Sequence, residues 1–130
     1  MQKTFIVSGT VPANQVANSI LPFKITFDPV RGPQDYYQAP TYGGLAILDI
    51  FVKSEQGVDG ILRIKKNGVV IYETHPINTL LISNPSRPVE PPMPILFNGG
   101  DKLEVEFINL DSPAADTTVT IYMKVDEETG

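Results

Sequence analysis

The chain of 130 residues has no cysteine and no tryptophan, and its one histidine is His75. Without cysteine it has no disulfide, no thiol nucleophile and no cysteine-ligated zinc or iron–sulfur centre. A lone histidine in front of Pro76 lacks the partners that a catalytic triad or a metal site requires, so we interpret it as a turn or interface residue. The sequence predicts no catalytic, metal-binding or cofactor-binding residue, and we expect that the protein is not an enzyme.

Basic residues are also few: 10 Lys and Arg stand against 15 Asp and Glu, which gives a formal net charge of -5. The only basic run is Arg63, Lys65 and Lys66, within a predicted strand. Nucleic-acid binding usually needs a basic patch that neutralises phosphates, so we expect no nucleic-acid partner. No apolar stretch approaches the roughly 20 residues of a membrane helix, and residues 1–11 lack the features of a signal peptide.

Carboxylates are the remaining candidates for acid–base chemistry. Glu104 and Glu106 would lie side by side on one strand face, but they alternate with apolar residues, so a solvated outer face is the simpler interpretation. Asp49 stands in the most apolar strand. It needs a partner such as Arg63 or Lys65 there, unless it marks the outer face.

Apolar and polar side chains alternate with period two, which is typical of half-buried strands. Asn67-Gly68 between two such runs predicts a hairpin with a type I′ turn. The acidic end, residues 126–130, is expected to fray. The runs lie at residues 4–11, 20–28, 45–54, 60–66, 69–74, 79–83, 95–97, 103–109 and 117–125. Two of these nine runs, 79–83 and 95–97, are short, and we expect about eight strands.

The chain, residues 1–130, is long enough for one domain and too short for two ordinary ones, so we expect a single domain. Many short strands between Gly- and Pro-rich turns predict an all-β, single-domain antiparallel β-sandwich. The long connections at residues 29–44 and 84–94 favour a jelly roll or a related Greek key over an up-and-down barrel, which would need short turns throughout. Pro22 interrupts one strand, so we expect a strand start or an edge position there.

The first long loop contains Tyr36, Tyr37 and Tyr42 within seven residues. Tyrosine rings on a loop are unfavourable unless they find a surface to cover. These three either form a contact surface for protein or carbohydrate, or fold back to cap one end of the sandwich.

The second long loop, residues 84–94, holds five prolines together with Arg87, Val89 and Met93. Such a segment is extended and stiff, and it loses little entropy when it docks. It is either an arm that lies across a neighbouring subunit or a rigid crossover within one domain. We therefore take Arg87, Val89 and Met93 as candidate contact residues, with the three tyrosines.

Two segments resemble parts of known proteins. Residues 94–107, in which a Gly-Asp turn leads into an alternating strand, resemble the penultimate-strand region of many jelly-roll proteins. The hairpin at residues 61–72 is similar to those of small virion proteins of tailed phages and of icosahedral viruses with jelly-roll coats. The resemblance implies a minor capsid, penton or decoration subunit, located in the virion, that binds copies of itself and other virion proteins. The alternative is a carbohydrate-binding β-sandwich module that stacks sugars on the loop tyrosines.

Overall fold

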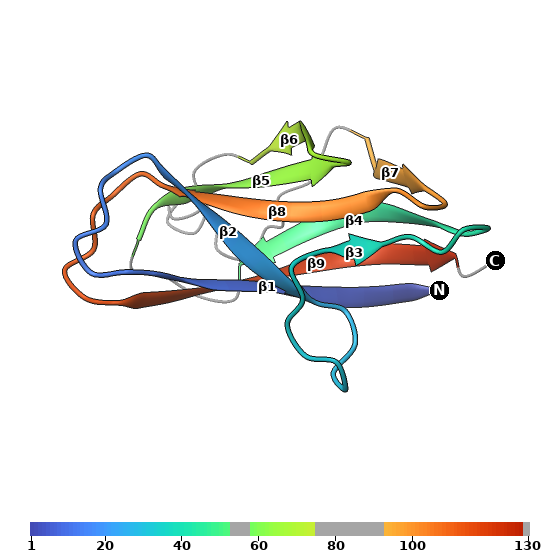
Figure 1. The fold of residues 1–130 in the computed structure, drawn as a ribbon, viewed down its shortest axis with the longest axis horizontal. Helices are drawn as coiled ribbons and strands as arrows, with labels where there is room; N and C mark the ends of the chain where they lie inside the picture. The colour runs from blue at the N-terminus through green and yellow to red at the C-terminus, as the bar shows by residue number, and fades with distance from the viewer. Residues whose placement is uncertain (53–57, 75–92, 129–130) are drawn as a thin grey trace.

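The computed structural model describes residues 1–52, 58–74 and 93–128 (Figure 1). Within these ranges the chain forms nine β-strands. They are β1 (Gln2–Val11), β2 (Ser19–Thr26), β3 (Tyr37–Gln38), β4 (Gly44–Val52), β5 (Gly60–Lys66), β6 (Val69–Glu73), β7 (Ile95–Asn98), β8 (Lys102–Asn109) and β9 (Thr117–Glu128). His75, the predicted strand at residues 79–83, Arg87 and Val89 lie outside the described residues.

The described strands form one antiparallel sheet in the order β6-β5-β8-β2-β1-β9-β4-β7, and β3 pairs with β8 beside this path. The sheet curls into a half-barrel (Figure 1). The predicted all-β antiparallel fold is confirmed. In place of the two separate sheets that we expected for a sandwich, hydrogen bonds run continuously from one half to the other.

Strand β2 is the joint between the two halves. Its residues 24–26 pair with β1, whereas its residues 19–23 pair with β8. Pro22, which has no N–H to donate, lies opposite Glu106 in the part of β2 that pairs along one side. The expected strand start or edge position is wrong, because Pro22 is the fourth residue of β2 and β2 lies between β8 and β1 in the sheet. Proline is accommodated there because residues 19–23 pair with β8 and not with β1.

One hydrophobic core fills the space between the halves. The rings of Phe23 and Phe107 stack at its centre, with centroids 4.9 Å apart and planes 9° from parallel. Gly9 and Gly60 lie against these rings, because a Cβ at either position would collide with one of them. Fully enclosed side chains come from both halves: Phe5, Val7, Ile25, Ile47, Ile50, Leu62, Ile64, Leu103, Phe107, Ile121, Met123 and Val125.

A bulge in strand β4 explains why apolar residues follow one another in its sequence without alternating. Its register against β9 shifts by one residue between Ile47 and Asp49. Ile47 and Ile50 are both buried as a result, and Asp49 lies opposite Lys124 on the outer face. The expected pairing of Asp49 with Arg63 or Lys65 is not formed, and the outer-face alternative holds.

The predicted Asn67-Gly68 hairpin is confirmed between β5 and β6. Both turn residues have positive φ, 51° for Asn67 and 83° for Gly68, as a type I′ turn requires. The Asn67 side chain also ties this turn to the β7–β8 turn. Its Nδ2 donates to Asp101 Oδ1 and its Oδ1 accepts from the Lys102 backbone N–H, each at 2.9 Å.

Candidate functional site

The three loop tyrosines occupy three different environments. Tyr37 is 4% exposed and its ring centroid lies 5.0 Å from those of Phe5 and Phe27. Tyr36 is half-exposed beneath the Lys102 ammonium, which lies 4.3 Å from its ring centroid. Tyr42 is 92% exposed. The three rings thus share no common surface: Tyr37 folds back and caps the core, which was the second of the two alternatives.

The other exposed candidate in the described residues is Met93, which precedes β7. Tyr42 stands in a turn that the Gly43 N–H closes by donating to the Pro40 carbonyl oxygen at 2.9 Å. Tyr42 and Met93 are therefore free to contact another molecule.

A polar cluster of the buried Tyr37 and Glu127 with the exposed Lys3 joins β3, β9 and β1. The Tyr37 hydroxyl donates to Glu127 Oε2 at 2.6 Å, and the Lys3 ammonium lies 2.7 Å from Glu127 Oε1. Glu127 is buried, while Lys3 reaches solvent. We had expected residues 126–130 to fray, but β9 continues to Glu128, opposite Gly44. Sequence reasoning missed Glu127 because its partners lie some 90 or more residues away in the chain.

The Tyr37 hydroxyl and the Glu127 carboxyl both have shifted pKa values. Burial raises the pKa of Tyr37 far above 10.0, and the hydrogen bond to Glu127 and its negative charge add to the effect. Burial alone would raise the pKa of Glu127. The hydrogen bonds from Lys3 and Tyr37 and the positive charges of Lys3 and the N-terminus outweigh it, so the net pKa lies below 4.5.

These shifts predict how the free energy of unfolding depends on pH. Glu127, with a pKa lowered by folding, stabilises the protein above pH 4.5, and this stabilisation is lost as pH falls through the lower folded value. Tyr37, with a raised pKa, stabilises below pH 10.0, and this is lost at more alkaline pH. Melting temperatures across this range should fall at both ends. In the Glu127→Gln variant the melting temperature should fall less at acidic pH than in the wild type. If it falls as steeply in both, Glu127 is not the source of the acidic loss of stability.

A pocket of about 620 Å³ opens beside the cluster. Its charged groups are already paired, since Arg31 lies 4.0 Å from Asp28 and Lys3 binds Glu127. Both carboxylate oxygens of Glu127 are occupied, so this group is suited to fastening strands together and poorly suited to accepting a proton from a substrate. The lining residues are Lys3, Thr4, Phe27, Asp28, Pro29, Arg31, Tyr37, Gln38, Pro40 and Glu127.

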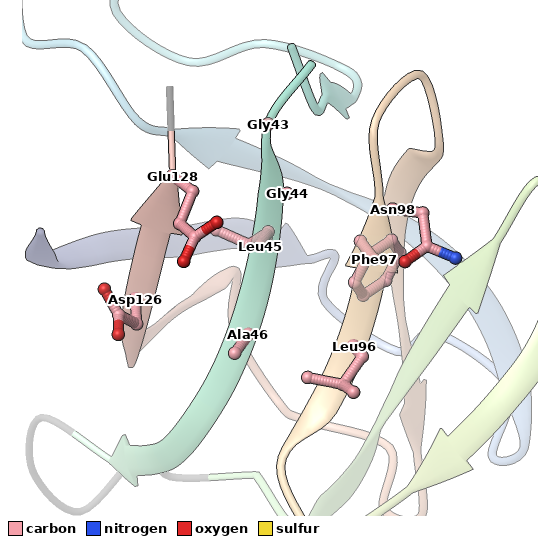
Figure 2. Close-up of a pocket in the computed structure, with 9 residues that line it drawn as sticks. All are labelled: Gly43, Gly44, Leu45, Ala46, Leu96, Phe97, Asn98, Asp126 and Glu128. Carbon is pink, nitrogen blue, oxygen red and sulfur yellow. The ribbon is translucent and has the colours of Figure 1, made fainter. Parts of the chain in front are cut away.

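A second, smaller groove of about 250 Å³ follows β4 between β7 and the end of β9 (Figure 2). The small residues Gly44 and Ala46 form its floor. In register, Gly44 lies between Asn98 and Glu128, and Ala46 lies between Leu96 and Asp126. One wall is therefore acidic, and the other combines an amide with an exposed leucine.

Strand β6 carries the most concentrated exposed apolar surface in the described strands. Val69, Val70 and Ile71 are 63%, 40% and 40% exposed. Within the described ranges β6 ends the sheet and pairs with β5 alone. The register between β5 and β6 shifts between Ile64 and Lys65 of β5. Ile71 of β6 therefore has no partner residue in the ladder and forms a bulge. Period-two reasoning predicts the strand but cannot predict that it lies at an edge.

Of the carboxylates that we considered for catalysis, Glu106 belongs to a partly exposed charge network. Arg63 lies 3.2 Å from Glu73 and 3.8 Å from Glu106, and Lys65 lies 3.8 Å from Glu106. These side chains point outward from neighbouring strands, as predicted for Glu106. Glu104 lies opposite Lys65 in the same ladder.

No protein-family model matches the chain, and a search of curated proteins found no match. Among the residues that the structure describes, no three His, Asp or Glu side chains gather as a metal site would require. The described residues also include no helix that is long and apolar enough to span a membrane.

Proposed function

We propose that the protein is a non-enzymatic assembly subunit that binds copies of itself through strand β6. The observation that carries the proposal is the run of three exposed aliphatic side chains, Val69, Val70 and Ile71, on the strand that ends the sheet within the described residues. An edge strand presents N–H and C=O groups on which another strand can pair, and natural edges are usually protected by charged side chains. This edge is apolar over three residues in succession.

A second copy is the partner that fits this edge best. An antiparallel pair of β6 strands with its two-fold axis at Val70 places Val69 of one copy opposite Ile71 of the other, so that apolar residues meet along the contact. The same alignment places Glu73, the last residue of β6 in one copy, near the turn that follows Lys66 in the other copy. The bulge at Ile71 keeps the pairing short. We therefore expect a contact below about 1,200 Å², typical of weak and concentration-dependent association.

We also propose that the assembly is a virion, in which this chain is a minor capsid, penton or decoration subunit. Support comes from the resemblance of the turn into β8 and of the β5–β6 hairpin to those of jelly-roll virion proteins. The continuous sheet, bent at β2 so that two halves enclose one core, is in our proposal a variant of the jelly roll. Carbohydrate binding on a tyrosine platform has less support, because Tyr37 is buried.

The Val70→Lys variant tests this function. Two like charges would face each other across the proposed two-fold axis, so we expect the dissociation constant for self-association to rise by about tenfold or more. Sedimentation velocity over a concentration series measures the change.

The matched control is Val30→Lys, the same substitution at a 94% exposed valine outside the strands. It should associate as the wild type does. The proposed contact is wrong if Val70→Lys associates as strongly as this control, and self-assembly itself is wrong if the wild type stays monomeric throughout the series.

A further inference from the structure

Two Asn-Gly dipeptides stand at neighbouring turns of the molecule: Asn67-Gly68 follows β5, and Asn98-Gly99 begins with the last residue of β7. An asparagine that precedes glycine is the most open to attack on its own side chain, because glycine has no Cβ to shield its backbone nitrogen. The reaction also needs an asparagine side chain that can rotate toward that nitrogen. The structure gives the two dipeptides very different freedom to do so.

The Asn67 side chain is held at both ends. Its Nδ2 donates to Asp101 Oδ1 and its Oδ1 accepts from the Lys102 N–H, both at 2.9 Å. Its backbone N–H also donates to the Lys102 carbonyl oxygen at 2.9 Å. Rotation of the amide toward Gly68 would break both side-chain hydrogen bonds.

The Asn98 side chain is exposed and projects from the end of β7 at the rim of the groove (Figure 2). Within the described part of the chain its amide group takes part in no hydrogen bond. Among the described residues, the hydrogen bonds of Asn98 within the turn run through its backbone: its N–H donates to Asp101 Oδ2 at 2.8 Å, and its carbonyl oxygen accepts from the Asp101 N–H at 3.0 Å. The amide is thus free to rotate while its backbone is anchored.

We propose that Asn98 is a site of spontaneous deamidation and isomerisation, and that Asn67 is protected from the same reaction. The Gly99 nitrogen attacks Asn98 Cγ, the bond from Cγ to Nδ2 breaks, and ammonia leaves with the Gly99 amide proton. Water then opens the resulting succinimide. Opening at Cγ leaves an aspartate, and opening at the backbone carbonyl leaves an isoaspartate whose chain runs through Cγ.

Either product changes the groove along β4. The new carboxylate would stand across Gly44 from Glu128, in a groove that already holds Asp126. Isoaspartate also adds a methylene to the backbone at the residue that pairs with Gly44, and so weakens the β4–β7 ladder. Slow chemistry at Asn98 would therefore alter the β7 edge of the sheet independently of contacts at β6.

Peptide mapping by mass spectrometry tests the proposal on the folded full-length protein incubated at mildly alkaline pH. We expect the Asn98 peptide to deamidate about tenfold or more faster than the Asn67 peptide, the ratio that two retained hydrogen bonds imply. In protein held unfolded by denaturant the two rates should converge.

The Asp101→Ala variant removes the acceptor of Asn67 Nδ2 and should speed deamidation of Asn67 relative to the wild type. Because it also removes the acceptor of the Asn98 N–H, the Asn67 rate is compared with that of Asn67 in the wild type and not with that of Asn98. A Gly99→Ala variant is unsuitable, since a Cβ there would collide with the Thr41 carbonyl. The proposal is overturned if Asn67 reacts as fast as Asn98 in the folded protein. It is also overturned if Asn98 remains intact when folded while the unfolded control has reacted.

Discussion

The Phe107→Ala substitution is expected to lower the free energy of unfolding by about 3–5 kcal/mol. Phe107 is fully enclosed, and its ring stacks on Phe23 and lies against Gly60. Because Phe23 belongs to β2, the joint between the two halves, truncation leaves a cavity where both halves share the core. A loss of this size is a large fraction of the 5–15 kcal/mol that typically stabilises a domain. Urea unfolding followed by far-ultraviolet circular dichroism measures it.

Phe51→Ala is the matched control, because Phe51 lies on the outer face of β4 and is partly exposed. The same atoms are removed there with little cavity, so we expect a cost of about 1 kcal/mol or less. Equal losses for the two variants would contradict a single core shared by both halves of the sheet.

Substitution of Glu127 by alanine is expected to cost about 2–4 kcal/mol, because it leaves the buried Tyr37 hydroxyl without an acceptor and removes the partner of Lys3. The Tyr37→Phe variant should cost less, since Glu127 keeps its ion pair with Lys3. Denaturant unfolding of both single variants and the double variant forms a cycle that measures the coupling between the two side chains.

Glu128→Ala is the control for this second prediction. Glu128 follows Glu127 on the same strand but is exposed, and it should change stability by no more than about 0.5 kcal/mol. If Glu127→Ala costs no more than Glu128→Ala, the cluster does not fasten β3 and β9 together.

Local patterns in the sequence predict the parts of the fold in which neighbours along the chain decide the structure. Strict alternation predicts β8 and β9, with Leu103 and Val105 facing inward. The Asn67-Gly68 dipeptide predicts its own turn, because positive φ at both positions selects these two residues. These features need no knowledge of the rest of the chain.

Long-range pairing decides the features that the sequence did not predict. The alternation of apolar and polar residues does not show that β2 pairs partly with β1 and partly with β8. A single curled sheet and two separate sheets therefore predict the same sequence pattern. From the sequence, Tyr37 is predicted to be a loop residue. Only the pairing of β3 with β8 and the hydrogen bond from the Tyr37 hydroxyl to Glu127 show that it belongs to the core. The same limit applies to β6. Its apolar side chains fit the pattern of core residues, and only the order of the described strands shows that β6 lies at the end of that order.

Hydrogen exchange of the β6 backbone amides at several protein concentrations tests the central claim most directly. If copies pair along this edge, the amides of residues 69–73 should gain protection as concentration rises, while the exposed turn at Tyr42 should exchange at an unchanged rate. Protection of residues 69–73 that stays the same from dilute to concentrated protein would contradict assembly through β6.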